Sequence, residues 1–185
     1  MIYVALLRGI NMGGKNKLDM KQLKGTFEQA GMQKVVTYIH SGNIIFADHQ
    51  ERSNAHTELA ELLEQAIAAD FGLHIKVLVR NLEEMHKLMQ ALPSDWTNND
   101  QAKSDVLFLW DEINDVDVLE KIPLKSGIGE IIYVPGALLY SVSREEASRS
   151  GMNKLVGSKM YSYMTVRNVN TTRKIYALMQ AAAEI

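Results

Sequence analysis

The order of apolar segments over residues 2–79 leaves few folds open to this 185-residue chain. Short runs rich in β-branched and aromatic residues, which predict strands, lie at residues 2–7, 35–39, 44–47 and 75–79. One amphipathic segment separates the first run from the second, and another separates the third from the fourth. His40-Ser41-Gly42-Asn43 supplies turn residues for a hairpin between the second and third runs. The resulting β-α-β-β-α-β order is that of the ferredoxin-like arrangement, in which two helices cover one face of an antiparallel sheet.

The two amphipathic segments carry helix start and stop signals. The first begins near Asp19, which has capping-box spacing to Gln22, and Gly31 suits a left-handed stop. The second begins at about Asn54 and stops at Gly72. Both are therefore predicted to be helices that pack on the sheet.

The second half repeats this pattern less clearly. Strands are predicted at residues 106–110, 131–134 and 138–142, and a long helix is predicted to start near Asn170. A polar stretch at residues 93–104 predicts a linker. We therefore expect an α+β fold of two ferredoxin-like β-α-β-β-α-β repeats, residues 1–92 and 105–185, with an additional C-terminal helix. No side-chain identity links the halves obviously, so the expected duplication rests on topology.

Composition excludes several classes of chemistry. The chain has no cysteine, which excludes disulfides, thiolate metal sites and cysteine nucleophiles. The five histidines are far apart and show no His-Glu-x-x-His pairing, so no metal and no cofactor is expected. No catalytic residue can be assigned, because no nucleophile elbow is present either. No apolar stretch approaches the ~20 residues that span a bilayer, so we expect a cytoplasmic protein without membrane contact.

The first loop combines three glycines and three cations with no acid. Glycines let successive backbone N–H groups point into one concavity, and the cations add positive charge where an anion would bind. The pattern matches part of the phosphate loop of nucleotide hydrolases, but Asn16 stands where that loop needs Ser or Thr, and the helix begins only at Asp19. We therefore reject an ATPase or GTPase and predict a simpler anion site. Its residues are Arg8, Gly9, Asn11, Gly13, Gly14, Lys15 and Lys17.

The start of the last helix is the second predicted part of this site. Arg173 and Lys174 fall in its first turn after a cap at Asn170 or Thr171, where the helix dipole disfavours each cation by ~0.3–1 kcal/mol. A bound anion would relieve this conflict, and residues 144–174 carry a net charge of +5 against −6 for residues 1–143. The predicted binding residues here are Arg167, Asn168, Asn170, Thr171 and Arg173, with Ser41 and Asn43 added from the hairpin turn.

Both the first loop and the start of the last helix also have a simpler explanation that involves no ligand. The first loop can be glycine-rich simply because it is a mobile, solvated loop that turns sharply. The cations of the last helix can point into water or pair with acids from the first half.

Three stretches of the sequence resemble the bacterial family of domain of unknown function 1697. They are Tyr3-Val4-Ala5-Leu6-Leu7-Arg8-Gly9-Ile10-Asn11-Met12-Gly13-Gly14-Lys15, Thr37-Tyr38-Ile39-His40-Ser41-Gly42-Asn43-Ile44-Ile45-Phe46, and Thr165-Val166-Arg167-Asn168-Val169-Asn170-Thr171. The resemblance implies an α+β fold with two ferredoxin-like repeats and supplies no activity. In the last motif the family usually has an aromatic residue where this chain has Val169.

Three functions remain open. The leading hypothesis is binding of a phosphorylated or otherwise anionic small ligand or nucleotide, with or without catalysis. The second is binding of nucleic acid across an open sheet face, although only 7% of the residues are aromatic. The third is an interaction or assembly protein without a small-molecule site, and the oligomeric state is left open.

Overall fold

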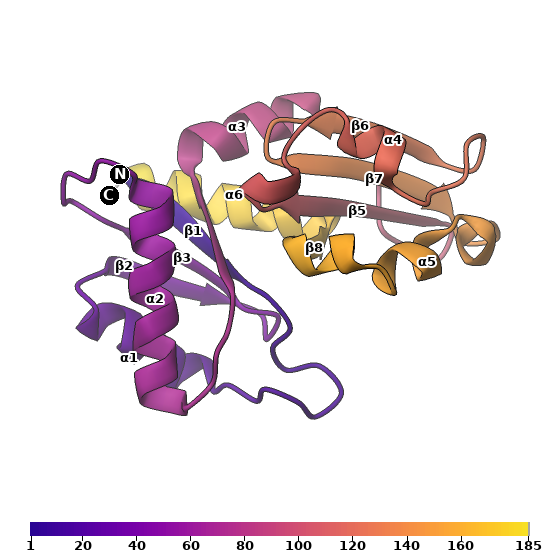
Figure 1. Cartoon of the computed structure of the whole chain (residues 1–185). Coiled ribbons are helices and arrows are strands. Elements are labelled where there is room, and N and C mark those ends of the chain that lie inside the picture. The colour runs from indigo at the N-terminus through magenta and orange to yellow at the C-terminus, as the bar shows by residue number, and fades with distance from the viewer. Residues whose placement is uncertain (185) are drawn as a thin grey trace. The chain divides into compact units, whose positions relative to one another are not determined.

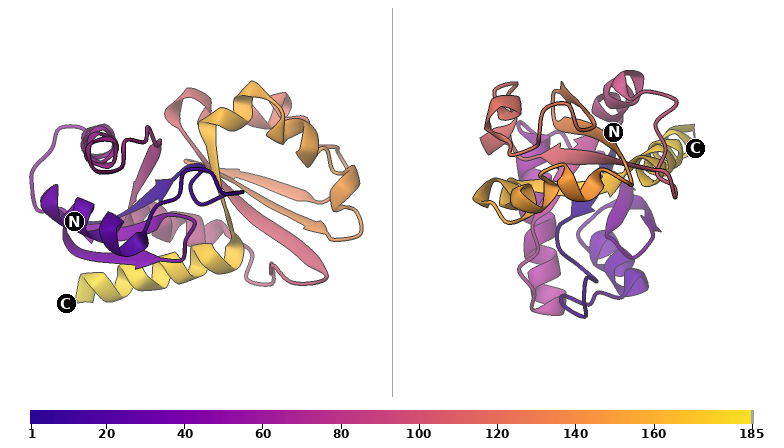
Figure 2. Two further views of the ribbon diagram at one scale, coloured as in Figure 1. Left: turned by 90° about the horizontal axis from the view of Figure 1, so that it is seen from below. Right: turned by 90° about the vertical axis from the view of Figure 1, so that its right-hand side faces the viewer.

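The computed structural model describes residues 1–184, and in them it has two four-stranded antiparallel sheets and six α-helices. The predicted α+β class is confirmed. The chain forms two compact units: Met1–Met85 together with Ile175–Ile185, and His86–Lys174. Figures 1 and 2 show each sheet with its helices.

The sheet of the first unit is built from four strands in the order β2-β3-β1-β4. These strands are β1 (Ile2–Leu7), β2 (Gln33–Tyr38), β3 (Asn43–Ala47) and β4 (Val77–Asn81). Every neighbouring pair is antiparallel, and Val4 lies opposite Ile45 on one side and Arg80 on the other. The strands predicted at residues 2–7, 35–39 and 44–47 are present to within two residues. The strand predicted at residues 75–79 is also present, but as β4 it begins and ends two residues later.

Two helices of the first unit pack on one face of this sheet. Helix α1 (Met20–Gln29) is capped as predicted, because the Asp19 carboxylate accepts a hydrogen bond from the Gln22 N–H at 2.8 Å. Helix α2 (Ala55–Phe71) ends at Gly72, which has a φ of +65°. The Asn54 side chain makes no capping bond; Glu58 instead accepts from the Asn54 N–H at 3.1 Å.

Burial in the first unit extends to both faces of the sheet. One face packs against the apolar residues Leu23 and Phe27 of α1 and Leu59 and Leu63 of α2. Val4 on the opposite face of β1 is also fully buried. Strand β1 is buried at all six residues, which explains why its sequence is a continuous apolar run rather than an alternating one.

The second unit has the same strand order as the first, read as β6-β7-β5-β8, again antiparallel throughout. The strands are β5 (Ala102–Leu109), β6 (Glu130–Val134), β7 (Ala137–Ser143) and β8 (Met164–Asn168). Helices α4 (Val118–Lys121) and α5 (Met152–Val156) are short, and three 3-10 turns accompany them.

Two longer helices each directly follow the last strand of a sheet. Helix α3 (Leu82–Ala91) follows β4, and α6 (Val169–Glu184) follows β8. Both helices begin in one compact unit and end in the other. Within the described part of the chain, no helix combines the length and the apolarity that crossing a bilayer requires.

The stretch predicted as a linker, residues 93–104, is structured. Its last three residues belong to β5, where the Ser104 hydroxyl pairs with that of Ser141 at 2.7 Å. Trp96 is buried. The sequence pattern missed the first residues of β5 because they include polar side chains. One of them, Ser104, is paired with a serine of the neighbouring strand β7, and an apolar pattern cannot reveal such pairing.

Candidate anion-binding site

The first loop contains a tight two-residue turn. The Lys15 N–H donates to the Met12 carbonyl at 3.0 Å, and these two residues form an isolated antiparallel bridge. Gly13 and Gly14 between them have φ values of +56° and +80°. Positive φ at both central positions is the requirement of a type I′ turn, which glycine meets without strain. The two glycines are therefore needed for the turn itself.

Asparagine side chains hold this loop in place. Asn11, at a φ of +52°, donates from its amide to the carbonyls of His40 at 2.7 Å and Leu18 at 3.2 Å. Its side-chain oxygen accepts from the Leu18 N–H at 2.8 Å. The Asn16 amide donates to the Gly9 carbonyl at 3.0 Å. The amide of Asn11, expected to orient a ligand, is thus engaged in closing the loop.

The lysines at the turn have a different environment. Lys15 and Lys17 are exposed, and no carboxylate within residues 1–184 lies within 4.0 Å of either ammonium group. The nearest acid in the sequence, Asp19, uses its carboxylate to cap α1. Arg8 is half-buried. The positive charge of Lys15 and Lys17 is therefore available to an anion in solution.

The hairpin turn between β2 and β3 lies against this loop. Asn43 is fully buried, and its amide donates to the Tyr38 carbonyl and the Ser41 hydroxyl, both at 3.0 Å. A Cβ on Gly42 would lie 2.7 Å from the Ile10 Cδ1, so the two segments approach too closely for a side chain. The fold thus places the hairpin turn, from which Ser41 and Asn43 had been assigned to the predicted site, directly against the first loop.

The start of α6 differs from the expectation in its cap. Asn168 is the capping residue, since its side-chain oxygen accepts from the Thr171 N–H at 2.8 Å. The prediction of Asn170 or Thr171 was wrong because β8 runs into α6 without a loop. Asn170 instead donates to the Asn98 carbonyl at 2.9 Å.

Arg173 and Arg167 both have neutral partners. The Arg173 guanidinium donates to the carbonyls of Trp96 at 2.6 Å and Pro93 at 3.0 Å. Because α6 begins at Val169, Arg173 and Lys174 lie beyond its first turn, and the predicted conflict of these two cations with the helix dipole was wrong. Arg167 has 6% of its surface exposed and donates to the Thr165 hydroxyl at 3.0 Å. Burial lowers the pKa of Arg167 to about 10.

A repeated tripeptide went unnoticed in the sequence. Val79-Arg80-Asn81 and Val166-Arg167-Asn168 each end the fourth strand of a sheet and lead into a helix. Both arginines are buried, and each donates from Nη1 to the carbonyl of the preceding valine at 2.9 Å. Each asparagine caps the helix that follows. These identical residues at equivalent strand ends link the two halves, contrary to the expectation that the duplication is visible in topology alone.

A histidine–carboxylate pair was also missed. His56 Nε2 lies 2.7 Å from Glu84 Oε2, and the Glu84 carboxylate also accepts from the Asn81 N–H at 2.8 Å. Burial acts to raise the pKa of Glu84, but the hydrogen bonds from His56 and Asn81 outweigh it and the pKa is lowered. The two residues are 28 positions apart, so sequence spacing could not reveal the pair. Across residues 1–184, no group of three His, Asp or Glu side chains could hold a metal ion.

Fold and loop together describe an α+β protein with two similarly ordered sheets and a cationic glycine turn after its first strand. The chain belongs to the family described as "Protein of unknown function (DUF1697)", whose model matches residues 1–140. The recognition by resemblance is confirmed. The matched range includes the first loop and the Ser41–Asn43 turn but not the start of α6.

One solved structure extends the comparison over nearly the whole chain. The chain is similar to the conserved bacterial protein SP0830 from Streptococcus pneumoniae, with 28% sequence identity and a TM-score of 0.80. The similarity covers 96% of this chain and 98% of that protein. Among curated proteins, no sequence matches this chain.

Proposed function

We propose that this chain binds a small anionic ligand, of the kind that carries a phosphate group, at its first loop. The observation that carries the proposal is the exposed pair Lys15 and Lys17, without a carboxylate partner in the described chain, beside the Gly13-Gly14 turn. Lysine binds phosphate as a point charge, and glycines without side chains let an anion approach the backbone of the turn. This combination favours an anion over a cation or a neutral ligand.

The expected affinity is modest because the site is open to water. Two unit charges 4 Å apart attract each other by about 1 kcal/mol in bulk water and by about 4 kcal/mol near a protein surface. Two lysines and a few backbone donors therefore support a dissociation constant on the order of a millimolar or somewhat lower. A ligand whose non-anionic part also contacts the protein would bind more tightly than phosphate alone.

The start of helix α6 is the second segment to which the sequence analysis assigned anion-binding residues. This segment consists of Arg167, Asn168, Asn170, Thr171 and Arg173, which belong to the other compact unit. The side chains of Asn168, Asn170 and Arg173 already bond within their own unit. We expect these residues to contribute less to binding than Lys15 and Lys17.

We further propose that each unit is a ferredoxin-like repeat. The support is the common strand order, in which the third strand of each set lies between the first and second and the fourth pairs with the first. Because this fold hosts many unrelated functions, the proposed repeat carries no activity with it. Cytoplasmic location likewise stays a prediction.

The two other functions have less support. Nucleic-acid binding in the manner of RNA-recognition modules needs an exposed sheet face with aromatic residues. Val4 and Leu6 in the first sheet, and Val106 and Leu139 in the second, are fully buried. Assembly has one specific observation in its favour: Val36, on the edge strand β2, has 42% of its surface exposed.

The anion proposal is tested by titrating the isotope-labelled protein with inorganic phosphate, glucose 6-phosphate and AMP while recording amide NMR shifts. We expect saturable shifts at residues 9–17, a loss of affinity of about two- to tenfold in Lys15→Ala and Lys17→Ala, and a larger loss in the double variant. Lys21→Ala is the matched control, because Lys21 is an exposed lysine of the same unit outside the loop. Equal losses in Lys21→Ala, or no saturable shift with any probe, would refute the proposal.

A further inference from the structure

The second unit contains a pocket that none of the predicted site residues touches. Its volume is about 290 Å³, just below the range of ~300–1,000 Å³ typical of small-molecule sites. Apolar side chains form much of its wall, namely Leu119, Ile122, Leu124, Ile128 and Ile131. Tyr140 of strand β7 also lines it.

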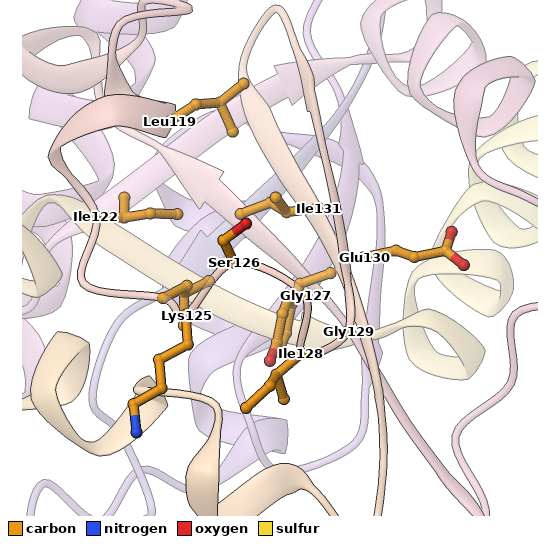
Figure 3. A pocket seen from close by; sticks show the side chains of 11 residues that line it. Leu119, Ile122, Lys125, Ser126, Gly127, Ile128, Gly129, Glu130 and Ile131 are labelled. Atoms are coloured by element: carbon orange, nitrogen blue, oxygen red, sulfur yellow. The ribbon is translucent and has the colours of Figure 1, made fainter.

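Few polar side chains line this pocket, and only some of them point toward its middle. Figure 3 shows the Ser126 hydroxyl pointing toward the middle of the labelled lining residues. The Lys125 ammonium and the Glu130 carboxylate extend away from that middle. A ligand in the pocket would therefore contact an apolar wall with hydroxyl groups rather than full charges.

The Tyr140 hydroxyl is the unusual group of this pocket. Tyr140 has only 2% of its surface exposed, and its hydroxyl has no hydrogen-bond partner among residues 1–184. Leaving a buried donor unsatisfied costs about 1–3 kcal/mol, so such groups are rare in native proteins and call for an explanation. A ligand with an acceptor atom would satisfy the hydroxyl.

The neighbouring Ser150 does not provide this acceptor. Its hydroxyl lies near enough to lower the pKa of Tyr140, although burial acts more strongly and raises that pKa overall. Ser150 donates to the Ala147 carbonyl at 2.7 Å and accepts from the Met152 N–H at 3.3 Å. Its proton and one of its two lone pairs are therefore used within its own turn, and the Tyr140 hydroxyl makes no hydrogen bond to the remaining lone pair.

A glycine segment covers the tyrosine. A Cβ on Gly129, which has a φ of +75°, would lie 2.6 Å from the Ser141 carbonyl oxygen and 3.3 Å from the Tyr140 ring. Gly127, with a φ of +79°, has no atom within 4 Å of such a Cβ. The segment thus packs closely at Gly129 and has free space at Gly127. Because the hydroxyl itself has almost no accessible surface, a ligand can reach it only if the pocket lining beside Tyr140 shifts when the ligand binds.

The charge near Tyr140 selects against anions. The carboxylates of Asp105 and Glu146 both act to raise the pKa of Tyr140, which means that each places negative potential at its hydroxyl. The same potential repels a carboxylate or phosphate more strongly than a neutral acceptor, which carries only a partial negative charge. The raised pKa also keeps the hydroxyl a donor well above neutral pH.

From the pocket, its apolar wall and the unpartnered hydroxyl, we infer that the second unit binds a neutral, mainly apolar small molecule whose carbonyl or similar acceptor receives a hydrogen bond from Tyr140. This site lies wholly within His86–Lys174 and is distinct from the proposed anion site of the first loop. Ligand occupancy requires no charge on the ligand and no metal.

Three ring compounds of nearly equal size test the inference in the full-length protein. Acetophenone has the acceptor, α-methylstyrene has the same shape without it, and benzoate replaces it with an anion. We expect acetophenone to shift the amide NMR signals of residues 119–131 saturably. We expect α-methylstyrene to bind about five- to tenfold more weakly, the ratio that one hydrogen bond contributes, and benzoate to bind more weakly still.

Tyr140→Phe is the decisive variant, because it removes only the unpartnered hydroxyl and should not lower the melting temperature. It should reduce acetophenone affinity about five- to tenfold and leave α-methylstyrene affinity unchanged. Ile131→Trp, which fills the pocket, should abolish both. Equal binding of acetophenone to wild type and Tyr140→Phe, stronger binding of benzoate, or no shift at all would each overturn the inference.

Discussion

Asn11 offers a sharp test of how the first loop is held. Its side chain makes hydrogen bonds of 2.7, 2.8 and 3.2 Å, and its backbone has a φ of +52°. Asn11→Ala removes all three bonds and leaves the Leu18 N–H and the His40 carbonyl without these partners. It also places an alanine in a conformation that asparagine tolerates better.

The expected loss of stability follows from these contacts. Each bond contributes a net ~0.5–1.5 kcal/mol, and the lower part of that range applies because the loop is only partly buried. The bonds together then contribute about 2 kcal/mol, and the left-handed backbone adds about 1 kcal/mol. We expect Asn11→Ala to lower the free energy of unfolding by about 3 kcal/mol. Asn11→Gly, which relieves the backbone strain, should lower it by about 2 kcal/mol.

Urea unfolding followed by far-UV circular dichroism measures these values, and amide exchange at Leu18 reports the local effect. Met12→Ala is the control, because Met12 has 68% of its surface exposed and its loss should change stability by less than about 0.5 kcal/mol. If Asn11→Ala unfolds at the same urea concentration as wild type and Leu18 exchanges no faster, the hydrogen bonds do not hold the loop and the reasoning fails.

The two helix caps and one glycine give further predictions. Asn81→Ala and Asn168→Ala should each cost about 1 kcal/mol in urea unfolding, since each removes one capping bond, and a negligible effect of either would contradict its assigned role. Gly151→Ala should be far more destabilising than Gly127→Ala in thermal denaturation, because its Cβ would lie 2.2 Å from the Pro123 carbonyl oxygen while that of Gly127 meets nothing. Similar melting temperatures for the two variants would show that backbone conformation alone decides the cost.

Much of the fold could be predicted from local patterns. The apolar runs of the first sheet, the Asp19 cap and the Gly72 stop are all local signals, and the structure has each of them. The second sheet was harder to predict because β5 begins with polar residues that pair across the strands, as Ser104 does with Ser141. Its connecting helices are also short, with four residues in α4 and five in α5, so their periodicity is weak.

The candidate site was predictable in composition and less so in roles. Glycine at positions 13 and 14 and lysine at 15 and 17 were recognised from the sequence. Only the tertiary structure shows that the Asn11 amide closes the loop and that the Arg173 guanidinium donates to backbone carbonyls. Hydrogen-bond partners 29 and 77 residues away leave no mark in a local pattern.

The sequence by itself determined the α+β class, the antiparallel hairpins and the glycine-rich first loop, because strand periodicity, helix caps and turn residues depend on neighbouring residues. Only the tertiary structure decided which polar groups are engaged and which are available. Asn11 and Arg173 are held by backbone carbonyls, Lys15 and Lys17 are exposed without a carboxylate partner in the described chain, and the Tyr140 hydroxyl is buried unpaired. These differences arise from which distant backbone and side-chain atoms the folded chain places within hydrogen-bond distance of each group.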